Sequence, residues 1–420
     1  MVYYVFDTLK TYNDTKIRGN NTMAQKKLRV AMIAPPWLAL PIEGYGGIEL
    51  VIEGIVKGLR KLDVDVELIA NGARKMRGVK THSIYNKEQF EQLERPFYEA
   101  MPILKAHMNF AINVIRDGDF DIIHTHDPDI GPHMLNWATQ IKGIPPALHT
   151  FHGPPFHTKE MVEQGEYENT LQYEHLKDMG NLYGVCISDA MAAMAPQEIQ
   201  KHMLPAVHNA IDMDIFPFIP NKKDYFITLA RFAPDKGQHI AAKLAAKQKK
   251  RLRMAGTVAG ITTSRKLLIE LSNPLSSFRG HPHFRYYSDN VLPYTLRHPR
   301  ITFSGNLSGS RKIKFIAQAK ALLFPIQWDE PFGMSVIEAL ACGTPVIAMN
   351  RGAMPEIIEH GVTGFLANNE QEFGEYMKRI DEIDPATCRK SVEERFSASA
   401  MAQAYLDRYH EVIRLSQKSK

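Results

Sequence analysis

Short apolar runs bounded by turn residues recur along the chain and alternate with amphipathic segments of helical period. The first run, residues 28–34 (LRVAMIA), ends at Pro35-Pro36, and apolar residues then recur at helical spacing from Ile48 to Leu62. Similar runs, which we predict to be strands, occupy residues 66–70, 121–125, 147–151, 184–188, 225–230, 251–256, 301–305, 321–326 and 345–349. Strands that alternate with helices form right-handed βαβ units, so the sheets should be parallel and covered on both faces. The pattern predicts an α/β fold.

One stretch interrupts this rhythm, residues 216–224 (FPFIPNKKD), which contains two prolines and several charges. We interpret it as a linker between two α/β domains of similar size. The expected units are a polar, unpatterned extension at 1–27 that should be flexible, a first domain at 28–215, a second domain at 216–396 and a final helix at 397–420. That helix carries Met401, Tyr405, Tyr409 and Ile413 four residues apart, so it should pack on another part of the chain. Residues 261–285 are weakly periodic, and we predict an insertion or a long loop there.

Composition excludes several classes of protein. Of the 420 residues, 51 are Lys or Arg and 46 are Asp or Glu, and a net charge of +5 is too small to indicate a nucleic-acid partner. No apolar run reaches the length of about 18 residues that a membrane-spanning helix needs, and the apolar part of MVYYVFDTLK is too short for a signal peptide. Cys186, Cys342 and Cys388 are too widely spaced for a disulfide scaffold or a cysteine zinc site. We therefore expect a cytoplasmic protein.

Ligands of doubly wound sheets bind outside the carboxyl ends of the strands, which selects a few loops for attention. In the first of them, Gly46 and Gly47 precede a predicted helix, where backbone N–H groups can face an anion. The dinucleotide fingerprint G-x-G-x-x-G fails here, because Glu49 stands at the position of its last glycine. The alternative is an ordinary glycine turn at a helix start.

The second loop, ARFAPDKGQ, follows a predicted strand directly and carries Arg231 and Lys236 on a turn with Pro234 and Gly237. Two cations five residues apart suit a diphosphate, because arginine supplies a planar fork of donors and lysine a point charge. A solvated loop is the alternative, and the spacing alone does not decide between the two.

The third loop, which starts at FPIQWDEPFGMSVIEAL, combines an anion site with two carboxylates. We expect Pro331 and Gly333 to open a helix, so that the N–H groups from Gly333 to Ser335 face a ligand with the helix dipole behind them. Glu330 lies in the loop and Glu338 about two turns into the helix. A carboxylate that accepts two hydroxyl hydrogen bonds is a common way to bind a ribose or a sugar diol. The alternative is a first-turn acid and a surface glutamate.

These motifs together resemble the family-4 retaining glycosyltransferases. The resemblance rests on E-P-F-G-x-x-x-x-E, A-x-G-x-P-V-I-A, G-x-x-P-E-I-I and G-x-T-G-F, in that order, and on GYGGIE, HTFHG and ARFAPDKG before them. It covers residues 28–413 except the segment 261–285. It implies the GT-B fold, in which two Rossmann-like domains face each other across a cleft. The chain departs from the family pattern at Asn209-Ala210 and Gly352-Ala353, where a glycine often stands in place of each alanine.

The resemblance also implies roles for individual residues. Glu338 should bind the ribose hydroxyls of a nucleotide sugar, and Arg231 and Lys236 should neutralise the leaving diphosphate. His152 should face the donor sugar from the first domain. Glu330 should hold the donor sugar and phosphates together with a set of donor-binding backbone groups, at Gly46, Gly47, Phe332, Gly333, Met334 and Ser335.

The implied reaction moves a hexose from a nucleotide-diphosphate sugar, UDP-glucose first among the candidates, to an acceptor that the sequence does not identify. A sugar, a lipid, a polysaccharide end or a small metabolite remains open, and residues 153–167 should help to bind it. The resemblance implies neither a metal nor a cofactor beyond the co-substrate. No residue stands out as a nucleophile, so retention by attack from the leaving-group face is a family expectation only. A monomer and a homodimer both remain open.

Other interpretations compete with this one. His124 and His126 form an H-x-H at a predicted strand end, near His149 and His152, which is a possible zinc set for a metal-dependent hydrolase. Several D-x-D pairs could serve a metal-dependent glycosyltransferase. A sugar-nucleotide epimerase or a phosphorylase would share the GT-B cleft, and a binding protein would share the fold. The basic run Lys247, Lys249, Lys250, Arg251 and Arg253 is either a solvated helix end or a contact with anionic lipid at the inner face of a membrane.

Overall fold

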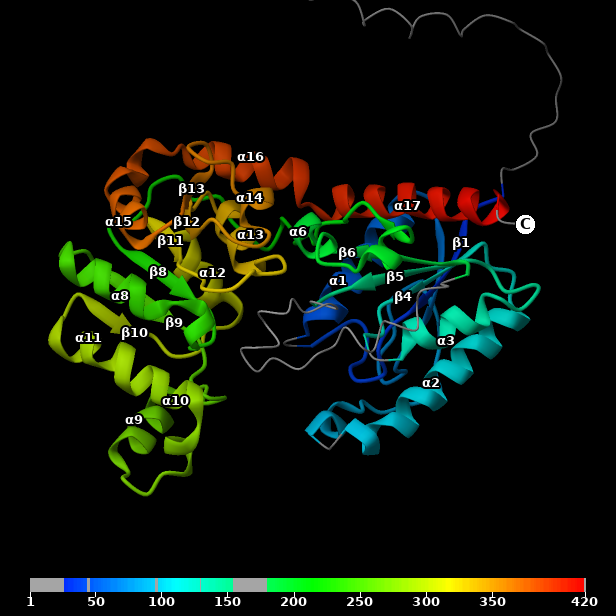
Figure 1. The fold of residues 1–420 in the computed structure, drawn as a ribbon, viewed down its shortest axis with the longest axis horizontal. Coiled ribbons are helices and arrows are strands. Elements are labelled where there is room, and N and C mark those ends of the chain that lie inside the picture. Colours follow the sequence, from blue (N-terminus) through cyan, green and yellow to red (C-terminus); the bar gives the residue numbers. More distant parts are fainter. Residues whose placement is uncertain (1–25, 44–45, 95–96, 129, 154–179, 419–420) are drawn as a thin grey trace, which may run out of the picture.

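The structure, a computed structural model, describes residues 26–43, 46–94, 97–128, 130–153 and 180–418, and contains two parallel α/β sheets (Figure 1). The first sheet has the order β3-β2-β1-β4-β5-β6-β7. Its strands are β1 (Arg29–Ile33), β2 (Asp65–Ile69), β3 (Lys80–His82), β4 (Ile122–Thr125), β5 (Ala147–Phe151), β6 (Leu182–Cys186) and β7 (Met203–Leu204). Every pairing within it is parallel. The predicted α/β class is confirmed.

The second sheet has the order β10-β9-β8-β11-β12-β13 and is parallel throughout. Its strands are β8 (Phe226–Leu229), β9 (Leu252–Ala255), β10 (Ile301–Phe303), β11 (Ala321–Phe324), β12 (Val346–Met349) and β13 (Gly364–Ala367). Counted within its domain, the second sheet runs 3-2-1-4-5-6, which is the Rossmann order, and the first sheet has the same order with β7 added beside its sixth strand. Each sheet therefore has its switch point beside its first strand, β1 in one and β8 in the other.

Strand β1 shows why the apolar runs are continuous rather than alternating. It pairs with β2 and β4, so it lies inside the sheet. Ala31 and Ile33 enter one hydrophobic cluster, whereas Val30 and Met32 enter another on the opposite face. A parallel strand with helices on both sides buries both faces, and both faces must then be apolar.

Helices cover both faces of each sheet. The first domain contains α1 (Gly47–Lys61), α2 (Phe97–Asp117), α3 (Gly131–Ala138), α6 (Asp189–Ala192) and α7 (Gln197–Gln200). The second contains α8 (Gln238–Lys247), α9 (Ser264–Ser272), α10 (Pro282–Tyr286), α11 (Leu292–Arg297), α12 (Gly309–Ala317), α13 (Met334–Ala341), α14 (Met354–Ile357), α15 (Glu370–Arg379) and α16 (Pro385–Arg395). None of the helices in the described part of the chain is long and apolar enough to span a bilayer.

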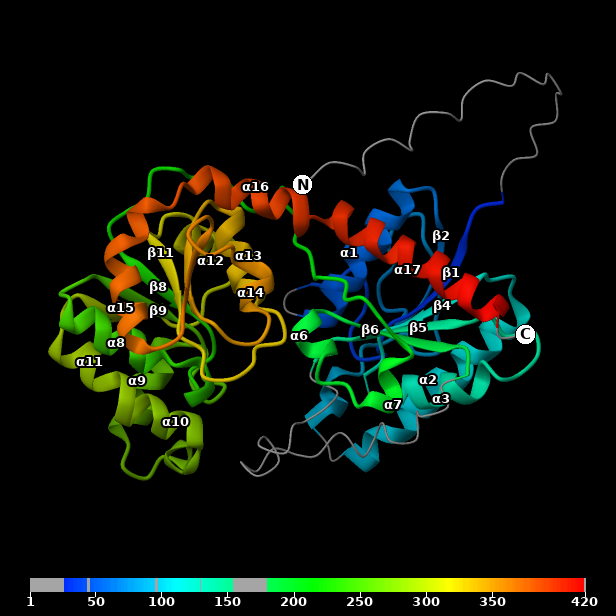
Figure 2. The ribbon, with the colours of Figure 1, turned by 45° about the horizontal axis from the view of Figure 1, so that its top comes forward.

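The last helix, α17 (Ala398–Lys418), lies across the first domain against α1 (Figure 2). Tyr405 and Tyr409 are fully buried there. A Cβ on Gly58 of α1 would lie 2.4 Å from the Cβ of Ala402, so the two helices approach more closely than a larger residue at position 58 would allow. At the far end Val412 is fully buried and Ile413 only partly, because a four-residue spacing drifts around a helix of 3.6 residues per turn.

The chain passes between the domains twice, and the two passages touch. Ile211, on the way out, forms a bridge with Ser397, on the way back, and its N–H donates to the carbonyl of Phe396 (3.0 Å). In the linker, the ammonium of Lys222 donates to the carbonyls of Ala317 and Cys342. The Ile211 contacts join the two connections to each other, and the Lys222 bonds tie the outgoing one to the second domain.

The structure differs from the expectation for residues 261–285. Most of this segment is helical rather than a loop: Thr263 caps α9, its side chain accepting from the N–H of Lys266, and Leu267 is buried beneath the helix. The segment has weak periodicity because Leu268 and Ile269, on the other side of α9, are exposed. Strands β3, β7 and β13 were not predicted, since they are two to four residues long and lie at or near sheet edges.

Candidate active site

The predicted site residues follow the carboxyl ends of strands in both sheets, and one carboxylate joins the two edges. Glu356 of α14 accepts hydrogen bonds from the backbone N–H groups of Asp189 (2.8 Å) and Ala190 (2.7 Å) and from Nε2 of His208 (2.9 Å). Burial acts to raise the pKa of Glu356, but these bonds outweigh it and hold the pKa below its usual value. The loops after β12 and β6 therefore meet, and the sheet edges that carry the site face each other.

The loop after β8 places Lys236 deep in the site and Arg231 at its surface. The ammonium of Lys236 donates to Oε2 of Glu330 (2.5 Å) and lies 4.5 Å from the ring centre of Trp328. Its side chain is 10% exposed, whereas that of Arg231 is 52% exposed and pairs with Asp235 (3.1 Å). The two cations flank Asp235, which also lies 3.5 Å from Lys236. An anionic ligand at this loop would meet both charges.

Gly237 makes this loop possible. Its φ is +64°, and a Cβ there would lie 1.9 Å from the carbonyl oxygen of Pro325 at the end of β11. Only glycine combines the left-handed conformation with such close approach. The loop after β8 is thereby held against the loop after β11, and this contact brings Lys236 to Glu330.

The loop after β11 contains Glu330 and a second functional side chain, Trp328, which is not part of the sequence-based prediction. Nε1 of Trp328 donates to Oε2 of Glu330 (2.6 Å), the same oxygen that Lys236 reaches. Gly352, with φ of +52°, lies against the backbone of Glu330, and the N–H of Ala353 donates to the Glu330 carbonyl (2.9 Å). A tryptophan two residues before an acid in a strand-end loop was the available signal for Trp328.

The helix after this loop begins at Met334, later than the sequence predicts. Gly333 is its N-cap with φ of +96°, so Pro331 and Phe332 precede the helix rather than open it. Phe332 is buried and its ring lies 5.7 Å from that of His208. The N-terminus of α13, at Met334 and Ser335, follows directly on the Glu330 loop, so the positive end of the helix dipole belongs to the same site.

Glu338 is buried in α13 and has a partner that the sequence did not reveal. Lys312 of α12 donates to its Oε1 (2.6 Å), while Oε2 is buried without a hydrogen-bond partner among the described residues. Burial raises the pKa of Glu338, and Lys312 opposes that effect only in part. A buried carboxylate oxygen without a donor has a strong preference for one, such as a hydroxyl group.

Gly46 and Gly47 lie at the start of α1, where Gly46 is the N-cap. A Cβ on Gly46 would lie 2.9 Å from Oε2 of Glu49. The side-chain carboxylate of Glu49 therefore lies at the start of this helix. Glu49 is 5% exposed, and burial raises its pKa. Gly46 and Gly47 belong to the first domain, whereas Lys236, Glu330 and α13 belong to the second.

His152 follows β5, and Nδ1 of His126 lies 2.8 Å from its Nε2. Burial lowers the pKa of His152 to about 3. His124 instead binds Tyr409 of α17 and Thr150, at 2.7 and 2.8 Å. Three of the four histidines of the proposed zinc set thus have hydrogen-bond partners within the protein, and no group of three or more potential ligands is arranged around a metal position in the described ranges. This arrangement does not favour the hydrolase alternative. Residues 154–167 of the expected acceptor loop lie outside the described residues.

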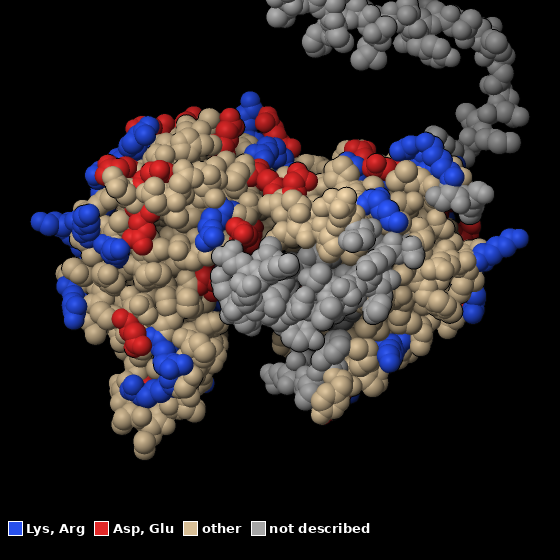
Figure 3. All heavy atoms as spheres, in the orientation of Figure 1, with Lys and Arg blue, Asp and Glu red and all other residues tan. Residues whose placement is uncertain are grey.

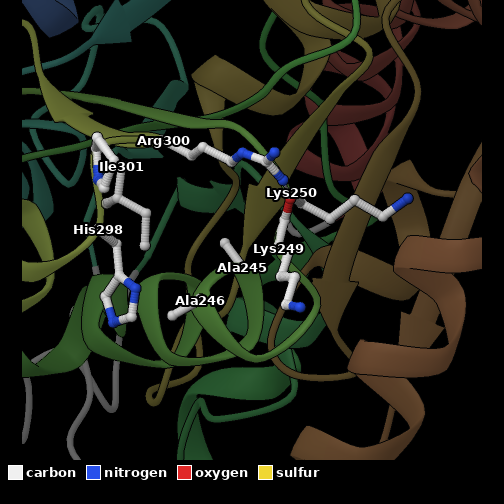
Figure 4. A pocket seen from close by; sticks show the side chains of 8 residues that line it. Ala245, Ala246, Lys249, Lys250, His298, Arg300 and Ile301 are labelled. Carbon is white, nitrogen blue, oxygen red and sulfur yellow. Dashed lines mark hydrogen bonds between the residues drawn. The ribbon is translucent and has the colours of Figure 1, made fainter.

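Members of the basic run make different local contacts. Lys247 ends α8, and the guanidinium of Arg253 lies over the rings of Tyr225 and Phe315. Lys249 and Lys250 line a cavity of about 160 Å³ in which Arg300 donates to the Lys249 carbonyl (2.7 Å; Figure 4). Acidic and basic side chains are intermingled over the face of the second domain that Figure 3 shows. The run is divided among local contacts.

Comparison with known proteins agrees with this architecture. The model of "Glycosyltransferase Family 4" matches residues 45–214, and that of "Glycosyl transferases group 1" matches residues 213–391. The D-inositol 3-phosphate glycosyltransferase of Mycobacterium sp. (strain KMS) is 24% identical over 358 residues, which cover 82% of this chain and 70% of that protein.

Two solved structures show the same fold. Sucrose-phosphate synthase from Thermosynechococcus elongatus has a TM-score of 0.63 and 18% identity, covering 93% of this chain and 100% of the other. Anabaena Alr3699/HepE in complex with UDP and glucose has a TM-score of 0.62 and 17% identity, covering 91% and 100%. The paired sheets, the strand-end loops and both family matches lead to one assignment. The chain belongs to the family-4 glycosyltransferases and is a glycosyltransferase of the GT-B fold.

Proposed function

We propose that the chain transfers a hexosyl group from a nucleotide-diphosphate sugar to a hydroxyl group, without a metal and with retention of anomeric configuration. UDP-glucose is the first candidate donor, because Alr3699/HepE has been crystallised with UDP and glucose and with UDP-glucose. The acceptor is proposed to be a sugar or polyol, since the mycobacterial relative is named for D-inositol 3-phosphate. The remaining support comes from the site itself.

The observation that carries the proposal is the carboxylate of Glu338. One oxygen is held by Lys312, and the other is buried with no donor among the residues described. The hydroxyl groups of a ribose are donors of the kind this oxygen needs, and a carboxylate commonly binds them in Rossmann-like sites. Glu338 stands on α13, whose N-terminus adjoins the Glu330 loop, so a nucleoside at Glu338 would direct its phosphates toward Lys236.

The departing diphosphate would then be stabilised by fixed charges. Cleavage of the anomeric bond develops negative charge on the leaving group, and Arg231, Lys236 and the N-terminus of α13 supply positive charge where it develops. Each such contact typically contributes about 3 kcal/mol to the transition state. In this proposal Lys236 exchanges part of its bond with Glu330 for the phosphate, and Glu330 becomes available to the hydroxyls of the donor sugar.

The test is donor binding by wild type and Glu338→Gln, measured by thermal shift over a panel of nucleotide sugars and then by calorimetry. We expect UDP-glucose to stabilise the wild type and Glu338→Gln to bind it about 10- to 100-fold more weakly, the range for a lost hydrogen bond to a charged group. Glu375→Gln, an exposed glutamate on α15, is the matched control and should bind like wild type. If Glu338→Gln binds UDP-glucose as tightly as wild type does, Glu338 does not bind the ribose.

A further inference from the structure

His126 has a hydrogen-bond partner at each of its ring nitrogens. It follows β4 and is fully buried. Its Nδ1 lies 2.8 Å from Nε2 of His152, and its Nε2 lies 3.1 Å from the sulfur of Met32 in β1. The position of the ring hydrogen on His126 therefore decides which histidine donates to the other.

Both rings are neutral near pH 7. Burial lowers the pKa of His126 well below its usual value, and the neighbouring histidines His124 and His152 lower it further. Burial also lowers the pKa of His152 to about 3. Each ring then carries a single N–H, and in each ring one nitrogen donates while the other accepts. Only two arrangements of the pair are left.

Met32 distinguishes these two arrangements. A thioether sulfur is a hydrogen-bond acceptor and never a donor. A hydrogen on Nε2 of His126 points at this acceptor, whereas a bare Nε2 would place its lone pair against those of the sulfur at 3.1 Å. The first arrangement is favoured. Nδ1 of His126 then carries the lone pair and accepts from Nε2 of His152, which leaves the lone pair of His152 on its Nδ1.

We infer that Met32 and His126 set the tautomer of His152, so that His152 presents Nδ1 to the donor sugar as an acceptor for a hydroxyl hydrogen. The inference rests on the proposed function, with a nucleotide sugar as donor, and on the family resemblance, which implies that His152 faces the donor sugar. Met32 and His126 are positioning residues, because they act through His152. A donor that lacks the hydroxyl, or that offers only an acceptor in its place, would lose this contact.

The C-terminal helix α17 contacts the His126–His152 pair through His124. The ring of His124 lies 4.1 Å from that of His126. Tyr409 lies 2.7 Å from Nδ1 of His124, and Thr150, which also contacts Tyr405, lies 2.8 Å from its Nε2. Since all of these groups are buried, His126 is confined between His124 and Met32. The helix that returns from the second domain thus reaches, through two histidines, the side chain that faces the donor.

The first experiment measures the tautomer directly. In full-length protein with ¹⁵N-labelled histidine rings, the ring ¹⁵N shifts of His152, assigned by comparison with His152→Gln, report which nitrogen carries the hydrogen. We expect it on Nε2 in wild type and on Nδ1 in Met32→Leu, because loss of the sulfur leaves a buried N–H without an acceptor and favours the other tautomer of His126. Met401→Leu is the matched control, since Met401 is a buried methionine of the same cluster as Met32. The exchange conserves volume, and both variants should fold.

The second experiment measures the consequence for the sugar. The ratio of the Kd for UDP to the Kd for UDP-glucose isolates the contribution of the glucosyl group and needs no acceptor. We expect this ratio to fall about 10-fold in Met32→Leu, the effect of a lost hydrogen bond that leaves a donor unpaired, and to be unchanged in Met401→Leu.

Three results would overturn the inference. If the wild type carries the His152 ring hydrogen on Nδ1, the tautomer assignment is wrong. If the tautomer of His152 is unchanged in Met32→Leu, the sulfur of Met32 does not set that tautomer. If the tautomer changes but the Kd ratio does not, His152 does not accept a hydrogen bond from a hydroxyl group of the donor sugar. If UDP-glucose fails to bind the wild type at all, the proposed donor is wrong, and the ¹⁵N shifts alone still decide the tautomer.

Discussion

Acidification should destabilise the first domain through histidines that are buried in the neutral form, and His149 is the clearest case. It lies in β5, is 1% exposed, and packs edge-on against Phe151 with ring centres 4.5 Å apart. Burial, with a smaller effect of His152, lowers its pKa to about 3. The usual pKa of an unfolded histidine is about 6.5. Because the folded pKa is the lower one, the stability that His149 contributes is complete above about pH 6.5 and is lost as the pH falls toward 3.

The magnitude follows from this difference. At about pH 5 the unfolded state binds the proton and the folded state does not, over an interval of about 1.5 pH units. At 1.36 kcal/mol per unit this amounts to ~2 kcal/mol lost by His149 relative to neutral pH. The assay is urea unfolding of wild type and His149→Leu at about pH 7.5 and about pH 5. On acidification, the free energy of unfolding should fall by ~2 kcal/mol less in His149→Leu than in wild type. This difference does not depend on how much stability the substitution costs at neutral pH.

The comparison of two pH values separates titration from packing. A leucine in place of His149 changes the packing equally at both pH values. The difference between the stabilities at the two pH values therefore contains only the effect of proton binding. His281→Leu, which removes an exposed histidine on the segment before α10, serves as the control for histidine removal as such. If His149→Leu loses as much stability on acidification as wild type does, His149 is not held neutral by burial and the reasoning fails.

Three further predictions concern the site. Replacing Arg231 and Lys236 together by alanine should reduce transfer at least 100-fold in steady-state kinetics, since each cation stabilises the leaving group, and activity near that of wild type would exclude a diphosphate site here. Gly352→Ala should weaken UDP-glucose binding in calorimetry, because a Cβ there would lie 2.4 Å from the backbone nitrogen of the Glu330 loop; Gly361→Ala, which shares a positive φ but has nothing within 4 Å, should bind normally. Equal affinities would show that this loop tolerates displacement. Glu356→Gln should increase the radius of gyration in small-angle scattering, and wild type should do the same as the pH falls through the depressed pKa of this carboxylate; an unchanged radius in the variant would show that Glu356 does not hold the domains together.

The local pattern of apolar residues was sufficient to predict the fold class, because the pattern within a strand indicates whether one or both of its faces are buried. Residues 28–34 are apolar without alternation, and β1 proves to be buried on both faces. Short or edge strands such as β3 carry no such signal, since Lys80 is exposed and Thr81 and His82 only partly buried. Residues 261–285 are mostly helical rather than a long loop, and their periodicity is weak for a similar reason, because the leucine and isoleucine on the outer side of α9 are exposed.

Site residues within one loop were also accessible from the sequence. Glycines that need a positive φ, such as Gly237 and Gly333, lie next to the charged groups whose loops they shape. Spacing along the chain predicted which strand end each group follows. It did not predict that Lys236 and Glu330, which are 94 residues apart, share a hydrogen bond, or that Trp328 joins them.

The amino-acid sequence by itself determined the α/β class, the two sheets and the strand-end loops, because hydrophobic period, capping and turn chemistry act over a few residues. The tertiary structure alone decided the partners of the charged and polar groups. Lys312 reaches Glu338 from another helix, Glu356 reaches the first domain at Asp189, and Tyr409 reaches His124 across 285 residues of chain. Hydrogen bonds and pKa values depend on distance and burial in space, and these are set only when sheets and helices pack.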